Sequence, residues 1–321
     1  MGHAHLLAAG LAGGSRTGGL LPVNDTTLDR WRPPARQCPA ALATGAVLVA
    51  VALSACTAVD ERADAAPAAP HSDTAALNHV HGVAVDPADD SVYLAAHAGL
   101  YRLSADGDVR VGPEIDLMGF AVVGPGHFIA SGHPGPATDL PQPVGLIEST
   151  DGGQTWQVLS RAGESDFHAL ASSSAGVLGF DGSLLSSADG STWQRREILA
   201  PPASLAATAD GTRVLATTDQ GVLLSTDGGV SWSVAAGSPL LQLVDWAPDG
   251  RTAVGVDPAG IVWSSPDSGA SWTEQGDLGA APQAMDVSAS PDGRSRLLVV
   301  TGAAVVESFD NGRTITELRS N

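Results

Sequence analysis

A short pattern that contains an aspartate recurs through the chain at nearly constant intervals. It reads STDGGQTW at 149–156, SADGSTW at 187–193, STDGGVSW at 225–232, SPDSGASW at 265–272 and SFDNGRTI at 308–315, with a weaker copy, SADGDVRV, at 104–111. Successive aspartates from Asp106 to Asp310 lie 45, 38, 38, 40 and 43 residues apart. A repeat of about 40 residues that holds several short strands is typical of a β-propeller blade.

The segments between these aspartates follow one order. An apolar stretch such as HGVAVD (81–86) leads through a turn to a second one, such as SVYLAAH (91–97). A glycine then opens a third stretch, as in GLYRLS (99–104), which runs into the aspartate turn, and a fourth stretch follows it. Alternating apolar residues bounded by Gly, Pro and Asp predict short strands. The sequence therefore predicts an all-β fold, a six-bladed β-propeller of four-stranded antiparallel blades over 78–321.

The aspartate segments resemble the Asp-box, or BNR repeat, S-x-D-x-G-x-T-W, of sialidases and many other propellers. An Asp carboxylate in such a turn can accept backbone N–H groups, a Gly supplies positive φ, and a Trp packs the turn onto its neighbour. We therefore expect a structural role for these residues, with Ile315 in place of a fifth tryptophan. They are Asp151, Asp189, Asp227, Asp267 and Asp310, with Trp156, Trp193, Trp232 and Trp272.

Residues 1–55 have the organisation of an export signal, although 1–28 look like an over-called start. Three arginines, at 30, 32 and 36, precede an apolar stretch (39–55) that is too short for a typical membrane-spanning helix. The stretch ends in Leu53-Ser54-Ala55-Cys56, which resembles the lipobox of bacterial lipoproteins. This resemblance implies cleavage before Cys56 and lipidation of its thiol, whereas the alternative is an ordinary signal peptide with a chance cysteine.

Residues 56–77 are rich in Ala and Pro and predict a flexible tether between that cysteine and the propeller. We therefore expect an exported monomer that is lipid-anchored at the outer side of the cell membrane. The two cysteines, Cys38 and Cys56, lie in the signal or at its end, which leaves the propeller without disulfides or thiolate ligands.

The charge of the chain excludes two classes of partner. It has 35 Asp plus Glu against 16 Lys plus Arg, no lysine at all, and a formal net charge of −19. Such a surface repels nucleic-acid phosphates and offers no basic patch to anionic lipid. Membrane attachment therefore requires the lipid anchor, and a small ligand, a glycan or a protein partner stays open.

The histidines are the second unusual feature. If the strands of each blade alternate in direction, the start of the first strand and the loop between the second and third strands lie on the same face of the ring. The aspartate turns, and also His127, then lie on the opposite face. The first face of three consecutive blades would thus carry His79, His81, His97, Asp116, Met118, His133, Asp166 and His168. No histidine follows His168, and Ser204, Gln242 and Gln283 occupy the corresponding positions.

Imidazoles that converge from several strands suit a transition metal. We predict a zinc or copper site with the five histidines as ligands, the two aspartates as further ligands or orienting groups, and Met118 as a soft ligand that favours copper.

Two other functions stay open. The HVHG, DLMGF, SGHP and DFH segments resemble bacterial lipoproteins labelled glycosylhydrolases, which implies glycoside hydrolysis with Asp116 and Asp166 as the acid/base pair, or with a metal-bound water. The sialidase mechanism itself is not expected, because Tyr93 and Tyr101 lie within strands and no arginine begins a first strand. The third possibility is a purely structural interaction module.

Overall fold

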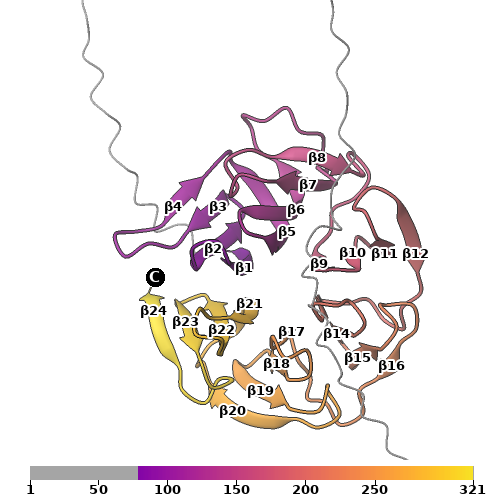
Figure 1. Cartoon of the computed structure of the whole chain (residues 1–321), viewed down its shortest axis with the longest axis vertical. Helices are drawn as coiled ribbons and strands as arrows, with labels where there is room; N and C mark the ends of the chain where they lie inside the picture. The colour runs from indigo at the N-terminus through magenta and orange to yellow at the C-terminus, as the bar shows by residue number, and fades with distance from the viewer. Residues whose placement is uncertain (1–78, 321) are drawn as a thin grey trace, which may run out of the picture. The chain divides into compact units, whose positions relative to one another are not determined.

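Six antiparallel sheets of four strands make up the computed structural model, which describes residues 79–320 (Figure 1). The prediction of an all-β, six-bladed propeller is confirmed. Within 79–320 there is no helix, and hence none that is long and apolar enough to cross a membrane. The predicted signal segment, Cys56 and all of the predicted tether lie outside the described residues.

Each blade consists of four strands that are consecutive in the chain. The first three blades comprise β1 (Val80–Asp86), β2 (Ser91–Ala96), β3 (Gly99–Arg102) and β4 (Val109–Val111); β5 (Ile115–Gly124), β6 (His127–Pro134), β7 (Leu146–Ser149) and β8 (Gln157–Ser160); and β9 (Ala169–Ser173), β10 (Gly176–Phe180), β11 (Leu184–Ser187) and β12 (Trp193–Arg196).

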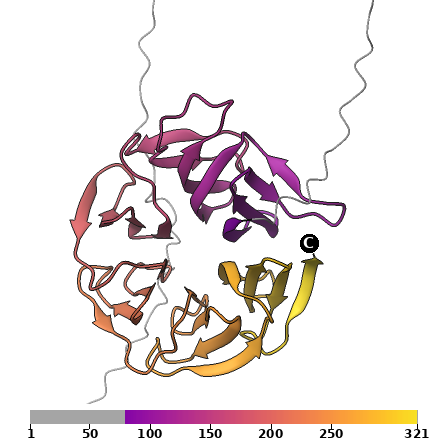
Figure 2. The same cartoon turned by 180° about the vertical axis from the view of Figure 1, so that it is seen from behind.

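The other three blades comprise β13 (Ser204–Ala207), β14 (Val214–Thr218), β15 (Gly221–Ser225) and β16 (Ser233–Val234); β17 (Leu243–Trp246), β18 (Ala253–Val256), β19 (Ile261–Ser265) and β20 (Thr273–Asp277); and β21 (Pro282–Ala289), β22 (Ser295–Thr301), β23 (Ala304–Ser308) and β24 (Thr316–Ser320). Seen from behind, the last blade again lies beside the first (Figure 2).

The core is divided into six apolar clusters, one at each junction between neighbouring blades. One cluster packs Val83 and Leu94 of the first blade against Leu298 and Val305 of the sixth. Both faces of every blade are therefore buried, which explains the near-continuous apolar runs of the inner strands. All four strands of the sixth blade come from the C-terminal segment, so the ring closes by side-to-side packing.

The aspartate turns hold themselves together. In the second blade, Asp151 accepts hydrogen bonds from the backbone N–H and the hydroxyl of Thr155 at 2.9 and 2.6 Å. Gly153, at φ +87°, donates its N–H to the hydroxyl of Ser149 at 2.8 Å. In the fourth blade the same pattern, led by the Ser231 hydroxyl, lowers the pKa of Asp227 to about 2. These carboxylates accept hydrogen bonds from within their own turns.

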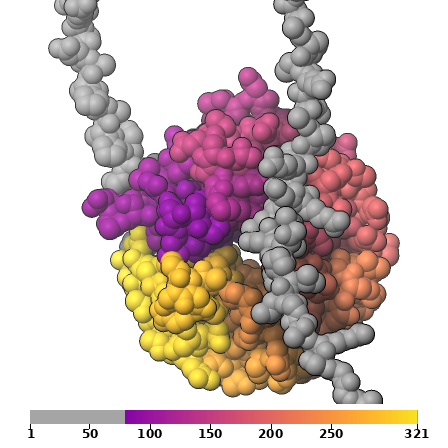
Figure 3. Space-filling view, viewed as in Figure 1, coloured from indigo at the N-terminus to yellow at the C-terminus, as the bar shows by residue number. Residues whose placement is uncertain are grey.

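The inner strands surround a cavity of about 640 Å³. An opening is visible between the indigo first blade and the yellow sixth blade (Figure 3). Most of the residues that line the cavity are apolar, but Asp245 of β17 and Asp286 of β21 also line it. Burial, together with the negative charge of Asp286, raises the pKa of Asp245 to about 7, and burial raises the pKa of Asp286 to about 6.

These two carboxyls give a testable pH dependence. Between about pH 4 and pH 7 these carboxyls keep protons in the folded protein that they have released in the unfolded chain. Their contribution therefore makes the free energy of unfolding fall as the pH rises. Asp286→Asn removes one of the two charges. We expect this variant to be roughly 1–3 kcal/mol more stable than the parent at pH 8 and equal to it at pH 4. Urea unfolding at both pH values measures this, with the exposed Asp219→Asn as control; a parallel offset at both values contradicts it.

Candidate metal centre

The predicted site residues lie at one end of the blades. In the first blade Val80 pairs with Ala96 at this end, and Asp86 pairs with Ser91 at the other. The aspartate turns occupy the other end, where Gly152 donates its N–H to the carbonyl of Gly126 in the β5–β6 turn at 2.8 Å. The strand directions thus place the imidazoles on the face opposite the aspartate turns.

β-bulges direct side chains into this end of the cavity. The β1–β2 register slips between Val80 and Gly82, which makes His81 the extra residue, and the β5–β6 register slips in the same way at Met118. A bulge bends its strand locally and re-aims a side chain. His81, Met118 and His168 of three consecutive blades all line the cavity.

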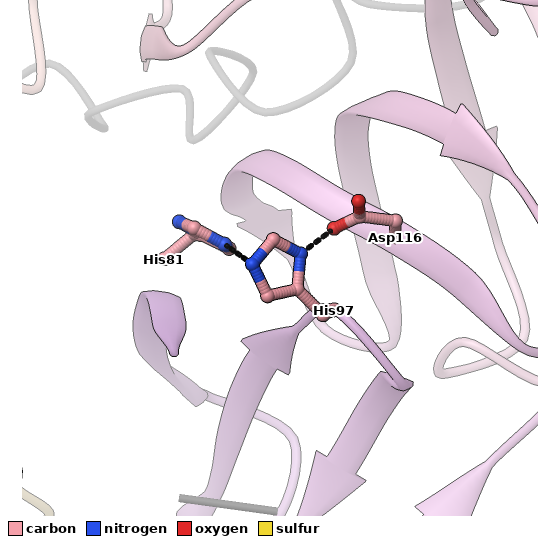
Figure 4. A group of neighbouring side chains, drawn as sticks. All are labelled: His81, His97 and Asp116. Carbon is pink, nitrogen blue, oxygen red and sulfur yellow. Dashed lines mark hydrogen bonds and ion pairs between the residues drawn. The ribbon is translucent and has the colours of Figure 1, made fainter. Parts of the chain in front are cut away.

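Three side chains form the closest cluster of donor atoms (Figure 4). His97, in the two-residue turn between β2 and β3, lies between His81 and Asp116 of β5. The Nε2 atoms of His81 and His97 are 3.3 Å apart, and Nδ1 of His97 lies 2.7 Å from Oδ1 of Asp116. One donor atom from each residue falls within 4.8 Å of the others. The His79 ring is 5.4 Å from the His97 ring, centroid to centroid.

The contacts continue into the second and third blades. Asp116 and His133 are cross-strand partners, and Oδ2 of Asp116 lies 3.4 Å from Nδ1 of His133. Nε2 of His133 is 3.2 Å from Oδ2 of Asp166, which is also 2.8 Å from Nε2 of His168. Imidazoles and carboxylates therefore alternate from His97 to His168 across three blades.

Two glycines allow the backbones to approach closely enough for these contacts. Gly132 has φ +147°, and a Cβ there would lie 1.9 Å from the carbonyl oxygen of Asp116. A Cβ at Gly119 would lie 2.4 Å from the carbonyl oxygen of Phe167. The N–H of Phe167 is in turn bound to the buried hydroxyl of Ser131 at 2.9 Å. Sequence reasoning missed these three positioning residues, although a small residue follows both His81 and Met118.

The electrostatics at the cluster favour the neutral form of His81. Burial lowers the pKa of His81, and the neighbouring His97, His168 and His79 lower it further, while Asp116 opposes them. Neutral imidazole is the form that binds metal ions. Among the residues that line the cavity, all within 79–320, there is no arginine. This end of the cavity therefore suits a cation or an uncharged ligand better than an anion.

The structure brings together seven of the eight predicted side chains. His79, His81, His97, Asp116, His133, Asp166 and His168 form the contacts described above, and Met118 lines the cavity beside them. The sequence predicts His127 on the other face; its Nε2 atom lies 2.7 Å from Oε1 of Glu148. The metal-binding and catalytic roles of these residues stay predictions.

Two of the three blades without histidines use the matching positions to join neighbouring blades. The side chain of Gln283, at a bulge equivalent to those of His81 and Met118, accepts the N–H of Val80 at 3.1 Å. Gln242 donates its amide to the carbonyl of Pro282 at 2.8 Å. These glutamines join neighbouring blades, and apart from their position nothing in the sequence indicates that role.

Comparisons with known proteins add the fold and little more. No family model matches the chain, and no curated protein matches it either. Among solved structures, an ancestral GH74 enzyme is 16% identical with a TM-score of 0.50, over 74% of this chain and 38% of its own. A gluconolactonase from Xanthomonas campestris is 15% identical with a TM-score of 0.54, over 69% of this chain and 82% of its own. The chain thus spans well under half of the GH74 enzyme, and no family match supports the Asp-box resemblance. This chain is similar in fold to propellers that include a glycoside hydrolase.

Proposed function

We propose that this propeller binds a transition metal ion, zinc or copper, through His81 and His97, with Asp116 orienting His97. The observation that carries the proposal is the separation of the two Nε2 atoms, 3.3 Å. Two nitrogens bound to one tetrahedral zinc ion at about 2.0–2.1 Å lie about 3.3–3.4 Å apart. The separation of the two imidazoles therefore suits a shared ion.

The contact between His97 and Asp116 supports the same assignment. A carboxylate can only accept, so the proton of neutral His97 lies on Nδ1, and the lone pair on Nε2 faces His81. This arrangement of carboxylate, imidazole and metal is common in zinc proteins and fixes the ring orientation. His79 and the soft Met118 are the further ligands we propose, and Met118 favours copper over zinc.

A second candidate function is hydrolysis of an uncharged glycan by Asp116 and Asp166. The observation in its favour is that a single imidazole, His133, separates the two carboxylates at 3.4 and 3.2 Å. Inverting glycosidases hold their carboxylates about 6.5–9.5 Å apart. The arginine-free wall of the cavity favours a neutral substrate within this hypothesis. Release of reducing sugar from neutral polysaccharides, lost in Asp116→Asn, is the test.

The cellular setting that we propose rests on the sequence. The lipobox-like segment that ends at Cys56 supports an exported monomer with a lipid anchor on that residue, held at the outer side of the membrane by a tether. Mass spectrometry of the mature N-terminus tests this directly.

A zinc titration tests the metal proposal. The tag-free full chain should bind zinc, and the double variant His81→Gln/His97→Gln should bind it at least about 100-fold more weakly, because two nitrogen ligands are lost. The matched control is His127→Gln, which removes one imidazole from the opposite face and should bind zinc like the parent. Equal affinity of the double variant and the control would overturn the proposal.

A further inference from the structure

The number of donors on this face exceeds what one ion can use. Five imidazoles and two carboxylates gather there, whereas zinc takes four ligands in structural sites and three plus water in catalytic ones. The contacts divide the donors into two groups. The first surrounds the Nε2 atoms of His81 and His97, and the second surrounds Asp166.

Asp166 presents one oxygen to two imidazoles and hides the other. Its Oδ2 lies 3.2 Å from Nε2 of His133 and 2.8 Å from Nε2 of His168. Its Oδ1 is buried and has no hydrogen-bond partner among the described residues. A buried oxygen without a partner indicates a missing ligand such as a water or an ion. The carboxylate therefore has coordination capacity that the surrounding protein does not use.

Asp116 orients a histidine in each group. Its Oδ1 is 2.7 Å from Nδ1 of His97 and its Oδ2 is 3.4 Å from Nδ1 of His133. Because the carboxylate accepts from both Nδ1 atoms, each neutral ring presents a lone pair at Nε2. In this neutral form the lone pair of His133 faces Oδ2 of Asp166 at 3.2 Å, and either a second proton on the ring or a metal ion between the two atoms would make the contact favourable.

We propose that the face holds a second divalent metal ion, bound by Asp166 and His168 with Nε2 of His133. The two ions share Asp116 as the carboxylate that orients one histidine ligand of each. A mixed set of imidazole and carboxylate ligands suits zinc and related borderline ions. The proposal goes beyond the first site, and its residues are different from His81 and His97.

Zinc stoichiometry and affinity on the full chain test the proposal. The parent should bind about two zinc ions in two steps, as measured by calorimetry and by elemental analysis after desalting. Asp166→Asn and His168→Gln should each bind one ion with the tighter step intact. The His168 side chain is 59% exposed, so its replacement leaves the fold undisturbed. Asp116→Asn should weaken both steps by about 10–100-fold, because it removes the shared orienting carboxylate.

The controls separate this proposal from the first. His127→Gln should bind two ions. The parent and every variant also share the histidines at 3, 5 and 71, so any zinc that these three histidines bind is the same in all samples. One ion in the parent, lost in His97→Gln and unaffected in Asp166→Asn, would overturn the second site and leave the first in place. One ion lost equally in both variants would mean a single shared site and also overturn the proposal. A parent protein that binds neither zinc nor copper would overturn both proposals.

Discussion

Gly132→Ala should destabilise the protein by about 2–5 kcal/mol and disrupt the metal centre. The new Cβ would lie 1.9 Å from the carbonyl oxygen of Asp116 and 3.0 Å from the backbone nitrogen of Met118. Both contacts are to backbone, so no side-chain rotation relieves them. The strands β5 and β6 must separate at the point where Asp116 faces His133. Urea unfolding measures the stability, and a zinc titration of the folded variant measures the effect on binding.

A second glycine variant separates backbone strain from the clash. Gly107 also has a positive φ, +122°, but a Cβ there meets nothing within 4 Å. Gly107→Ala therefore carries the conformational penalty alone and should cost about 1 kcal/mol, with zinc binding unchanged. If the two variants lose the same stability, the positive φ alone requires glycine at position 132, and the close approach of β5 and β6 does not.

The fold was predictable because the repeat fixes both the number of blades and the direction of their strands. The aspartate segments mark the third-to-fourth strand turn of each blade, and alternating strands then determine which end every other connection reaches. The same reasoning placed His97, between β2 and β3, on one end with Asp116 at the start of β5. Strand direction is a property of the whole ring, so it survives errors of one or two residues in strand boundaries.

The geometry within the site was not predictable, because it depends on local irregularities. Simple alternation puts His79 and His81 on one side of a strand, whereas a bulge at His81 sets its direction in the structure. The sequence contains no separate signal for a bulge beyond the small residue that follows. The division of the histidines between Asp116 and Asp166 likewise depends on which oxygen each ring reaches.

The mode of ring closure was also left open by the sequence. Closure depends on contacts between residues more than two hundred positions apart, such as Arg296 with Asp90 at 3.3 Å. Charged residues near strand ends are common on surfaces, and nothing in their local sequence indicates a partner in another blade. Only the spatial meeting of the first and sixth blades identifies these pairs.

Arg319→Met should destabilise the ring by about 3–5 kcal/mol at neutral pH, because it leaves a buried carboxylate without its partner. Nη1 of Arg319, in β24, lies 2.8 Å from Oδ1 of Asp108, beside β4 of the first blade. The Asp108 side chain is 1% exposed, and its Oδ2 has no hydrogen-bond partner in the described part of the chain. Burial raises the pKa of Asp108, and Arg319 opposes that rise.

The pH dependence and a double variant test whether this loss arises from the buried charge. Without Arg319 the pKa of Asp108 rises further, so its folded state keeps a proton that the unfolded chain releases above about pH 4. The difference in stability between parent and Arg319→Met should therefore grow as the pH rises from 4 to 7. Arg319→Met/Asp108→Leu removes both charges and should recover most of the loss, since apolar replacements of buried pairs are often neutral or stabilising. A loss that is independent of pH and persists in the double variant would instead indicate that packing of the Arg319 side chain holds the blades together.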